Sequence, residues 1–232
     1  MSLAFDSDLA LRRLVVAAGQ APSVHNTQPW RFRVPDGELI ELFADLDRRL
    51  RVGDPRGRNQ LVSCGAALFN LRLAVRTGGR RPMVWLLPNP EEEPELLAAV
   101  RMGAALPASA EQLELYNMIP IRRTSRRPYF TRTLPPAVLV ELRLAASREG
   151  ARLVPLDRHR AADTLEHAAL AEDELSRDHA YLAELAAWTM PRARHDGVPG
   201  YTLGPPRRSS GTPRWRRAHR STACSGSTRS RR

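Results

Sequence analysis

Hydrophobic and polar positions follow helical and strand periods in turn along the first hundred residues. Apolar side chains recur every three or four positions over residues 7–19 and 58–77, which predicts two amphipathic helices that end at glycines. Between them, alternating apolar positions over residues 30–34 and 38–43 flank Pro-Asp-Gly, which is typical of a β-hairpin. The first hundred residues therefore predict a helix, a hairpin and a second, central helix.

The same pattern continues with less regularity toward the C-terminus. The remaining elements that it predicts are a buried strand at 83–87, a strand or helical turn up to about residue 106, a helix at 109–118, a helix at 135–150, a strand at 152–156 and a helical stretch at 160–188. Helix, glycine-containing break and strand over residues 139–156 repeat the order of residues 11–34. This weak internal repeat predicts a first half at 1–106, a second half at 107–205 and a separate tail at 206–232.

A polar loop, Ala-Pro-Ser-Val-His-Asn-Thr-Gln-Pro-Trp over residues 21–30, separates the first helix from the hairpin. It would carry Ser23, Asn26 and Gln28 on a fixed turn, and the two amides each offer a donor and an acceptor on one planar group. That chemistry suits the imide edge of a flavin or nucleobase. In the alternative interpretation, Ser23 and Asn26 only bond the backbone of the turn, and we expect such a turn role for His25.

A cluster of basic residues, Arg-Arg-Thr-Ser-Arg-Arg over residues 122–127, precedes the predicted helix at 135–150. Guanidinium groups bind phosphate oxygens in pairs, and a Thr or Ser hydroxyl can add a further bond. The cluster therefore predicts a phosphate clamp. A solvated basic turn is the alternative for any isolated run of arginines.

Composition narrows the function classes. All 36 basic residues are Arg, so mechanisms that need a lysine nucleophile, a Schiff base or a Walker lysine are excluded. The net charge of +11 is concentrated in residues 206–232, which hold nine Arg and no acid, whereas residues 1–205 carry a net charge of only +2. No helix-turn-helix, zinc-finger or RNA-binding aromatic signature accompanies this tail.

The sequence gives little indication of a metal site, a reactive cysteine or a membrane-spanning segment. Cys64 and Cys224 are too few for a disulfide framework, and Cys64 lies in an apolar run where we expect a buried thiol. His159, Asp163 and His167 recur at four-residue spacing, but we interpret them as a solvated helix face and expect no metal site. Without a signal-peptide pattern or a long apolar run, we expect a cytoplasmic protein with no membrane partner.

Three segments together resemble the nitroreductase family, and in particular its Acg-type members from mycobacteria and other actinobacteria. These segments are the loop at 21–30, Ser-Cys-Gly-Ala-Ala-Leu-Phe-Asn-Leu-Arg at 63–72 and Ile-Arg-Arg-Thr-Ser-Arg-Arg-Pro at 121–128. The resemblance covers residues 1 to about 205. It implies an α+β fold with a central, mainly antiparallel sheet flanked by helices. It also implies that full-length relatives are pseudo-dimeric monomers of two similar halves, of which the second is incomplete here.

The resemblance also implies an FMN site shared between the two halves. Ser23, Asn26 and Gln28 would contact the flavin ring or ribityl chain. The phosphate would bind to residues of the second half, namely Arg122, Arg123, Thr124 and Arg126. NAD(P)H would act as a transient reductant, and hydride would pass through flavin N5 to a small-molecule acceptor such as a nitroaromatic or quinone, with no catalytic side chain required.

The tail departs from the family. Residues 206–232 contain nine Arg and six Ser and no Leu, Ile, Val, Phe or Met, so they cannot extend a core. Acg-type chains continue for roughly another hundred residues, so we interpret the tail as an out-of-frame product and the chain as C-terminally truncated, with activity possible only if the site survives. The alternatives are a flavin-sequestering protein without turnover and a nucleic-acid-binding protein with a basic tail.

Overall fold

The computed structural model describes residues 7–126, 133–190 and 195–200. The described residues divide into two compact units, the first formed by residues 7–125, 180–190 and 195–200 and the second by residues 126 and 133–179. These units are defined by contacts in space, whereas the expected halves at 1–106 and 107–205 are defined by an internal repeat. The division into halves therefore remains a prediction. The tail at 206–232 lies outside the described residues.

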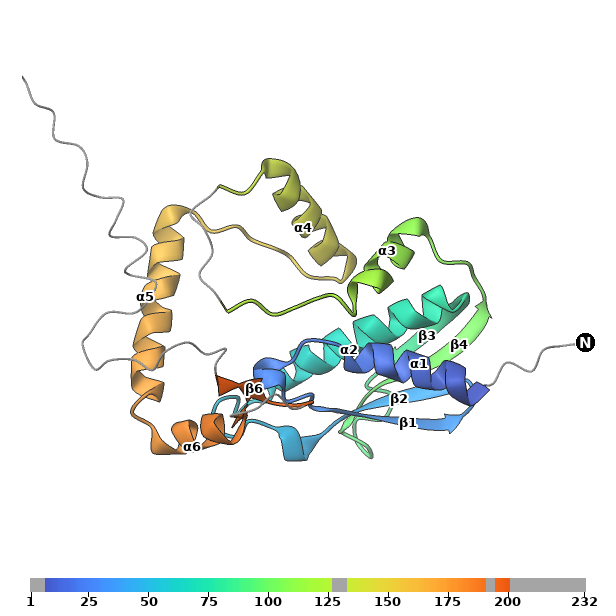
Figure 1. Ribbon diagram of the computed structural model, residues 1–232, viewed down its shortest axis with the longest axis horizontal. Coiled ribbons are helices and arrows are strands. Elements are labelled where there is room, and N and C mark those ends of the chain that lie inside the picture. The colour runs from blue at the N-terminus through green and yellow to red at the C-terminus, as the bar shows by residue number, and fades with distance from the viewer. Residues whose placement is uncertain (1–6, 127–132, 191–194, 201–232) are drawn as a thin grey trace, which may run out of the picture. The chain divides into compact units, whose positions relative to one another are not determined.

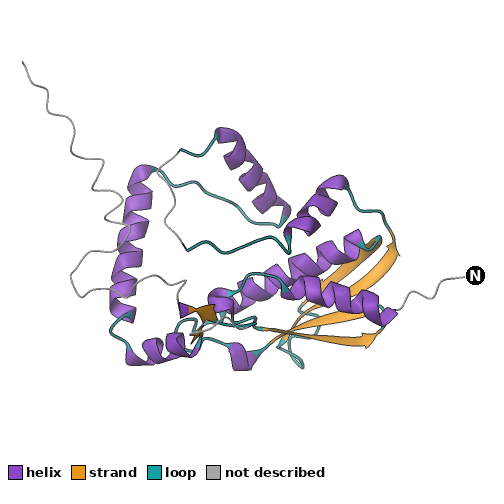
Figure 2. Ribbon diagram, in the orientation of Figure 1, coloured by secondary structure: helices purple, strands orange, loops and turns teal. Residues whose placement is uncertain are grey.

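A four-stranded antiparallel sheet forms the centre of the first unit, with strand order β1-β2-β4-β3 (Figure 1; Figure 2). Its strands are β1 (Trp30–Asp36), β2 (Leu39–Ala44), β3 (Arg80–Leu86) and β4 (Leu96–Ala105). Together with the helices, this sheet confirms the expected α+β class. The segment that the sequence left open between strand and helical turn is β4, which pairs with both β2 and β3.

Three helices of the first unit precede or follow these strands, namely α1 (Ser7–Gly19), α2 (Arg58–Thr77) and α3 (Ala110–Met118). The two long helices α1 and α2 lie along the same face of the sheet (Figure 1). One buried cluster joins Ala18 of α1, Ile40 and Val100 of the sheet, and Leu71 and Val75 of α2. The bounds of α2 agree with the predicted range, which confirms the central helix.

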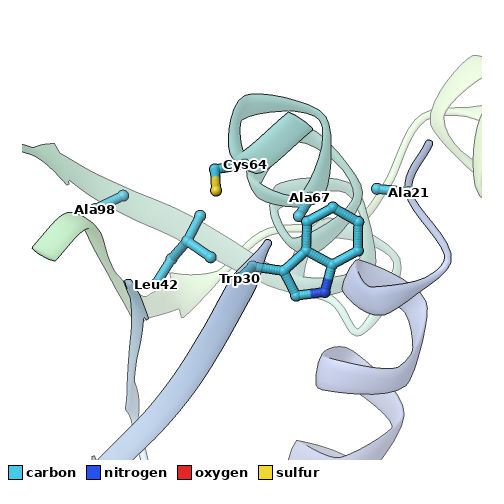
Figure 3. Packing of buried hydrophobic residues seen from close by; sticks show 6 residues of the cluster. All are labelled: Ala21, Trp30, Leu42, Cys64, Ala67 and Ala98. Carbon is cyan, nitrogen blue, oxygen red and sulfur yellow. The ribbon is translucent and has the colours of Figure 1, made fainter. Parts of the chain in front are cut away.

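A second buried cluster lies under the polar loop. Trp30 at the start of β1 packs beside Ala67 and Cys64 of α2, and Leu42 and Ala98 line the sheet below them (Figure 3). Trp30 is buried in this cluster, with 9% of the residue exposed. The C-terminal end of the loop therefore lies on close-packed side chains, and this packing limits the positions that its backbone can take.

The hairpin turn between β1 and β2 is closed by a carboxylate. Oδ1 of Asp36 accepts hydrogen bonds from the backbone N–H groups of Glu38 and Leu39, at 2.8 Å each. The bond from Glu38 is the main cause that holds the pKa of Asp36 below its ordinary value, and Arg101 at 3.3 Å contributes. The Pro-Asp-Gly prediction is confirmed, and its Asp supplies the turn's side-chain acceptor.

The strand predicted at 83–87 is present as β3, but the prediction that it is buried is wrong. β3 forms the edge of the sheet, and its Met83, Trp85 and Leu86 are all exposed by 43% or more. An apolar run fits a strand buried on both faces as well as an edge strand, and the sequence period alone does not separate them.

A short C-terminal stretch completes the first unit. Helix α6 (His179–Ala187) begins at the unit boundary and leads to β5 (Thr189–Met190), which pairs in parallel with β6 (Val198–Pro199). The carboxylate of Glu184 on α6 accepts hydrogen bonds from the backbone N–H groups of Val52 and Gly53, at 3.0 and 2.7 Å. Residues far apart in the sequence are thus tied into one unit.

The second unit contains α4 (Pro136–Arg148) and α5 (Arg158–Leu175), and neither helix has a buried residue. One prediction for this region is wrong, and a second is refined. Residues 152–156 form no strand, because the described part of this unit offers no neighbouring strand to pair with. The helical stretch at 160–188 is two helices, α5 and α6, separated at residues 176–178. Among all the described residues, no helix is both long enough and apolar enough to cross a bilayer.

Candidate functional site

The loop between α1 and β1 has an unusual backbone. His25, Asn26 and Gln28 have φ values of 49°, 54° and 50°, in the left-handed region that side chains with a Cβ rarely adopt. Three such residues within four positions cost free energy, of order 1–3 kcal/mol each. The surrounding contacts must therefore hold the loop in this shape.

Ser23 supplies one of these contacts. Its hydroxyl accepts a hydrogen bond from the backbone N–H of Gln28 at 2.9 Å, and its carbonyl accepts one from Asn26 at 3.0 Å. Ser63 of α2 accepts a bond from the backbone N–H of Val24 at 3.4 Å. The turn role that we considered for Ser23 is thus present, and its O–H hydrogen is still able to donate.

Cys64 also contacts this loop. Its Sγ lies 3.1 Å from the carbonyl oxygen of Pro29, and burial raises the pKa of the thiol to about 12. A thiol with that pKa stays protonated at neutral pH and does not act as a nucleophile. The expectation that Cys64 is a buried thiol is confirmed.

Asn26 and Gln28 turn toward a distant part of the chain. Nδ2 of Asn26 donates to the carbonyl oxygens of His195 at 3.3 Å and of Gly197 at 3.1 Å. The N–H of Gly197 donates back to the carbonyl of Asn26 at 3.1 Å, and Nε2 of Gln28 donates to the carbonyl of His195. The predicted ligand-binding amides are therefore engaged by residues 195–197.

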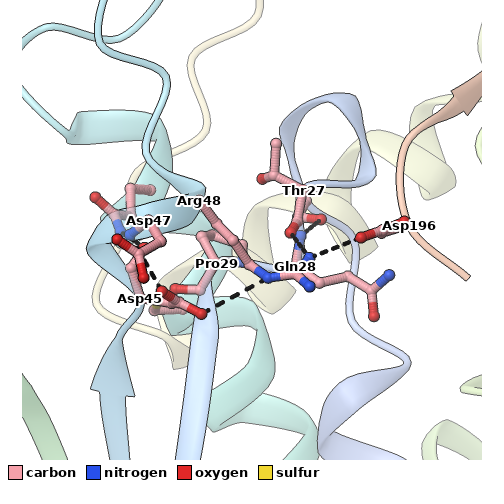
Figure 4. A network of polar contacts seen from close by, with 10 residues as sticks. Thr27, Gln28, Pro29, Asp45, Asp47, Arg48 and Asp196 are labelled. Atoms are coloured by element: carbon pink, nitrogen blue, oxygen red, sulfur yellow. Dashed lines mark hydrogen bonds and ion pairs between the residues drawn. The ribbon is translucent and has the colours of Figure 1, made fainter. Parts of the chain in front are cut away.

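Arg48 joins the loop to the same segment (Figure 4). Its Nη1 donates to the carbonyl of Thr27 at 2.8 Å and to Oδ2 of Asp196 at 3.1 Å, while its Nε lies 3.6 Å from Oδ2 of Asp45. One guanidinium thus connects the loop, the turn that precedes α2 and the C-terminal stretch of the unit. Bonds to charged partners of this kind are stronger than bonds between neutral groups.

An open cleft of about 880 Å³ borders this network. Its lining comprises Gln28, Trp30, Arg31, Asp45, Arg48, His195 and Asp196. The cleft thus combines an indole, an amide, two guanidinium groups, an imidazole and two carboxylates. Because six of these seven side chains are polar or charged, the cleft suits a ligand with several hydrogen-bonding groups.

The arginine cluster at 122–126 forms a second group. Nη1 of Arg122 lies 3.2 Å from the hydroxyl of Thr124, and Nη1 of Arg123 donates to the carbonyls of Pro120 and Arg122 at 2.7 and 2.8 Å. Arg126 belongs to the second unit. Arg122, Arg123, Thr124 and Arg126 are exposed, so their joint role with the loop remains a prediction.

The histidines of α5 have local partners. Nδ1 of His159 lies 3.4 Å from the carboxylate of Asp163, and Nδ1 of His167 lies 2.7 Å from the Asp163 carbonyl. Within the described ranges, no cluster of three or more His, Cys, Asp or Glu side chains is placed to hold a metal ion.

The sequence interpretation missed Arg48, His195 and Asp196. Arg48 lies in a charged, turn-rich stretch that resembles ordinary surface, and Asp196 precedes a Gly-Val-Pro turn with no local signal of function. Their meeting depends on a contact between residues 148 positions apart. A sequence period of two to four residues carries no information about such a contact.

Comparison with known proteins adds an evolutionary context to this geometry. No protein-family model matches the chain. A Mycobacterium tuberculosis protein, provisionally named NAD(P)H nitroreductase Rv3131, is 35% identical over 202 residues, which cover 86% of this chain and 56% of that protein. A second protein of this organism, provisionally named NAD(P)H nitroreductase acg, is 30% identical over 193 residues, covering 83% and 58%.

This chain spans somewhat more than half the length of these relatives. Among solved structures, a nitroreductase-like protein from Streptococcus mutans aligns with a TM-score of 0.35 and 16% identity, covering 45% of this chain and 81% of that one. A nitroreductase family protein from Streptococcus pneumoniae aligns with a TM-score of 0.34 and 16% identity, covering 56% and 87%. The fold assignment rests on the sheet and helices of the chain itself.

Proposed function

We propose that this chain, a homologue of the Acg-type nitroreductases, is built to bind FMN as an NAD(P)H-dependent oxidoreductase. The acceptor would be a small nitroaromatic or quinone-like molecule. The observation that carries the proposal is the strained loop at 23–28, because contacts with the core hold its shape and the amide of Gln28 lines the cleft. Strain of this kind persists where the surrounding structure fixes it, often at a ligand site.

The donor set of the loop fits the flavin. The hydroxyl of Ser23 and the amides of Asn26 and Gln28 offer the donors and acceptors that an imide edge or a ribityl hydroxyl requires. Arg122, Arg123 and Arg126 offer bidentate phosphate bonds, and the hydroxyl of Thr124 offers one further bond. When bound, FMN would supply the hydride chemistry between nicotinamide and acceptor. The residues of the chain would bind and orient the flavin, and none of them would need to act as a nucleophile.

The phosphate clamp is tested by comparing FMN with riboflavin, which lacks the phosphate. Arg122→Ala combined with Arg126→Ala should weaken FMN binding at least tenfold, because charge-assisted contacts contribute roughly 1.5–3 kcal/mol each. Riboflavin binding should change little. The affinities follow from fluorescence quenching of each flavin during titration with the protein.

A matched control removes two other exposed arginines of the first unit, Arg51→Ala with Arg56→Ala. This variant loses the same net charge, so it reports the contribution of long-range attraction alone. Equal losses for FMN and riboflavin, or an equal loss in the control, would remove the phosphate assignment.

Turnover separates an enzyme from a flavin store. A protein reconstituted with FMN should oxidise NADPH or NADH faster when menadione or a nitrofuran is present. Flavin that binds without any acceptor-dependent oxidation would instead support the sequestering alternative. A protein that takes up neither FMN nor riboflavin would contradict both.

A further inference from the structure

Residues 195–199, here called the strap, occupy the hydrogen-bonding groups that a ligand of the loop would use. An amide NH₂ group has two hydrogens, and Asn26 gives them to the carbonyls of His195 and Gly197. The backbone carbonyl of Asn26 accepts from the backbone N–H of Gly197. In this arrangement Asn26 has no amide hydrogen left for a flavin carbonyl.

Besides its bonds to the amides of the loop, an ion pair, a backbone hydrogen bond and a short strand pairing hold the strap in place. The ion pair between Arg48 and Asp196 joins it to the loop, and the N–H of Val198 donates to the carbonyl of Trp188 at 2.8 Å. Its pairing with the rest of the unit is only two residues long, Val198–Pro199 against Thr189–Met190. Gly197 has a φ of 77°, which a residue with a Cβ rarely adopts. A segment whose regular strand pairing is only two residues long is a candidate for local opening.

We propose that the strap is an internal competitor for the ligand of the loop and that the Arg48–Asp196 ion pair is its latch. This inference rests on the proposed flavin site, because that site supplies the ligand. A tethered segment competes at a high effective concentration. The apparent affinity for ligand is reduced by the fraction of molecules in which the strap is open. Weakening the latch should therefore strengthen flavin binding, whereas loss of an ordinary binding residue would weaken it.

The latch itself is tested without flavin. In Asp196→Ala, hydrogen exchange at the amides of Gly197 and Val198 should become about 3- to 10-fold faster, the range expected for a partly exposed, hydrogen-bonded ion pair. Exchange at Leu42 in the buried sheet should not change. Asp47→Ala removes the same charge from an exposed position of the neighbouring turn and should leave the strap amides as they are. Unchanged exchange in Asp196→Ala would overturn the latch.

Competition is tested by FMN titration of the full chain. Asp196→Ala should bind FMN about 3- to 10-fold more tightly than the unaltered chain, by the same factor as the strap opens. Gly197→Ala should act in the same direction by a different route, since alanine is strained at a φ of 77°. FMN added to the unaltered chain should speed exchange at Gly197.

The remaining outcomes are separable. Weaker FMN binding in both variants, or slower exchange at Gly197 when FMN is added, would mean that the strap closes over the ligand, and competition would be wrong. If neither the chain nor any variant binds FMN, the proposed function and the competition both fail, while the exchange data still decide whether the latch exists.

Discussion

At the scale of single residues, the polar loop shows why some of the site was predictable. The residue types at 23, 26 and 28 predict a turn with hydrogen-bonding side chains, and the structure confirms the turn. Their partners were not predictable, because Asn26 bonds to His195 across 169 positions. The resemblance to the nitroreductase family is confirmed by the relatives, but the flavin roles of these side chains remain a prediction.

Cys64 gives a prediction at this scale. In the Cys224→Ser variant, a disulfide reagent should not label the folded protein at pH 8 to 10, because burial raises the pKa of the Cys64 thiol to about 12. In urea the thiol regains its ordinary pKa of 9.0, so labelling should become fast over the same range. Folding therefore loses stability as the pH rises from 9 toward 12, since only the unfolded state ionises.

The measurement is the absorbance of the released thiol anion, with the Cys64→Ser, Cys224→Ser double variant as the blank. Rapid labelling of the folded protein at pH 8 would show an accessible thiolate, and the structural role of Cys64 would then be wrong.

At the scale of elements, prediction succeeded where one face of a segment is covered by its immediate neighbours. The helix α2 was predicted from the spacing of its own apolar residues, and the β1–β2 hairpin from its own turn residues. Both signals lie within the element itself. The edge position of β3 and the absence of a strand at 152–156 were not predicted, because burial and strand formation depend on partners elsewhere in the chain. Apolar content alone predicted that β3 is buried and that residues 152–156 form a strand.

Two leucines of α2 test the packing of this helix. Leu71 is fully buried against α1 and the sheet, whereas Leu61 is 52% exposed on the same helix. Leu71→Ala should lower the free energy of unfolding by about 2–5 kcal/mol through lost burial and a residual cavity. Leu61→Ala should change it by about 0.5 kcal/mol or less. Urea unfolding followed by circular dichroism gives both values, and similar losses for the two variants would contradict this arrangement of α2.

At the scale of the whole molecule, the two units differ in how much core they contain. The first unit has two buried clusters, whereas α4 and α5 of the second have no buried residue. Exposed apolar side chains such as Val140, Leu144 and Leu170 give the second unit little burial to offset the entropy of ordering. A chain of this kind need not unfold in one cooperative step. We expect α4 and α5 to unfold at lower denaturant than the first unit.

The tie between α6 and the loop after β2 tests this division. Glu184→Ala removes both hydrogen bonds to the N–H groups of Val52 and Gly53 and should destabilise the first unit by about 1.5–3 kcal/mol. Trp30, Trp85 and Trp188 all lie in that unit. In a Trp215→Phe background, tryptophan fluorescence therefore reports the first unit, while circular dichroism also reports α4 and α5. Glu184→Ala should shift the fluorescence transition to lower urea. The earlier transition, in which α4 and α5 unfold and which only circular dichroism detects, should stay in place.

Two further variants separate the bond from the charge. Glu184→Gln keeps the size of the side chain and one acceptor oxygen, so it should recover part of the loss. Glu174→Ala removes a carboxylate from an exposed position of α5, and it should not move the fluorescence transition. If fluorescence and circular dichroism instead follow a single transition that Glu184→Ala and Glu174→Ala shift alike, the chain unfolds as one body and the division into two units has no energetic counterpart.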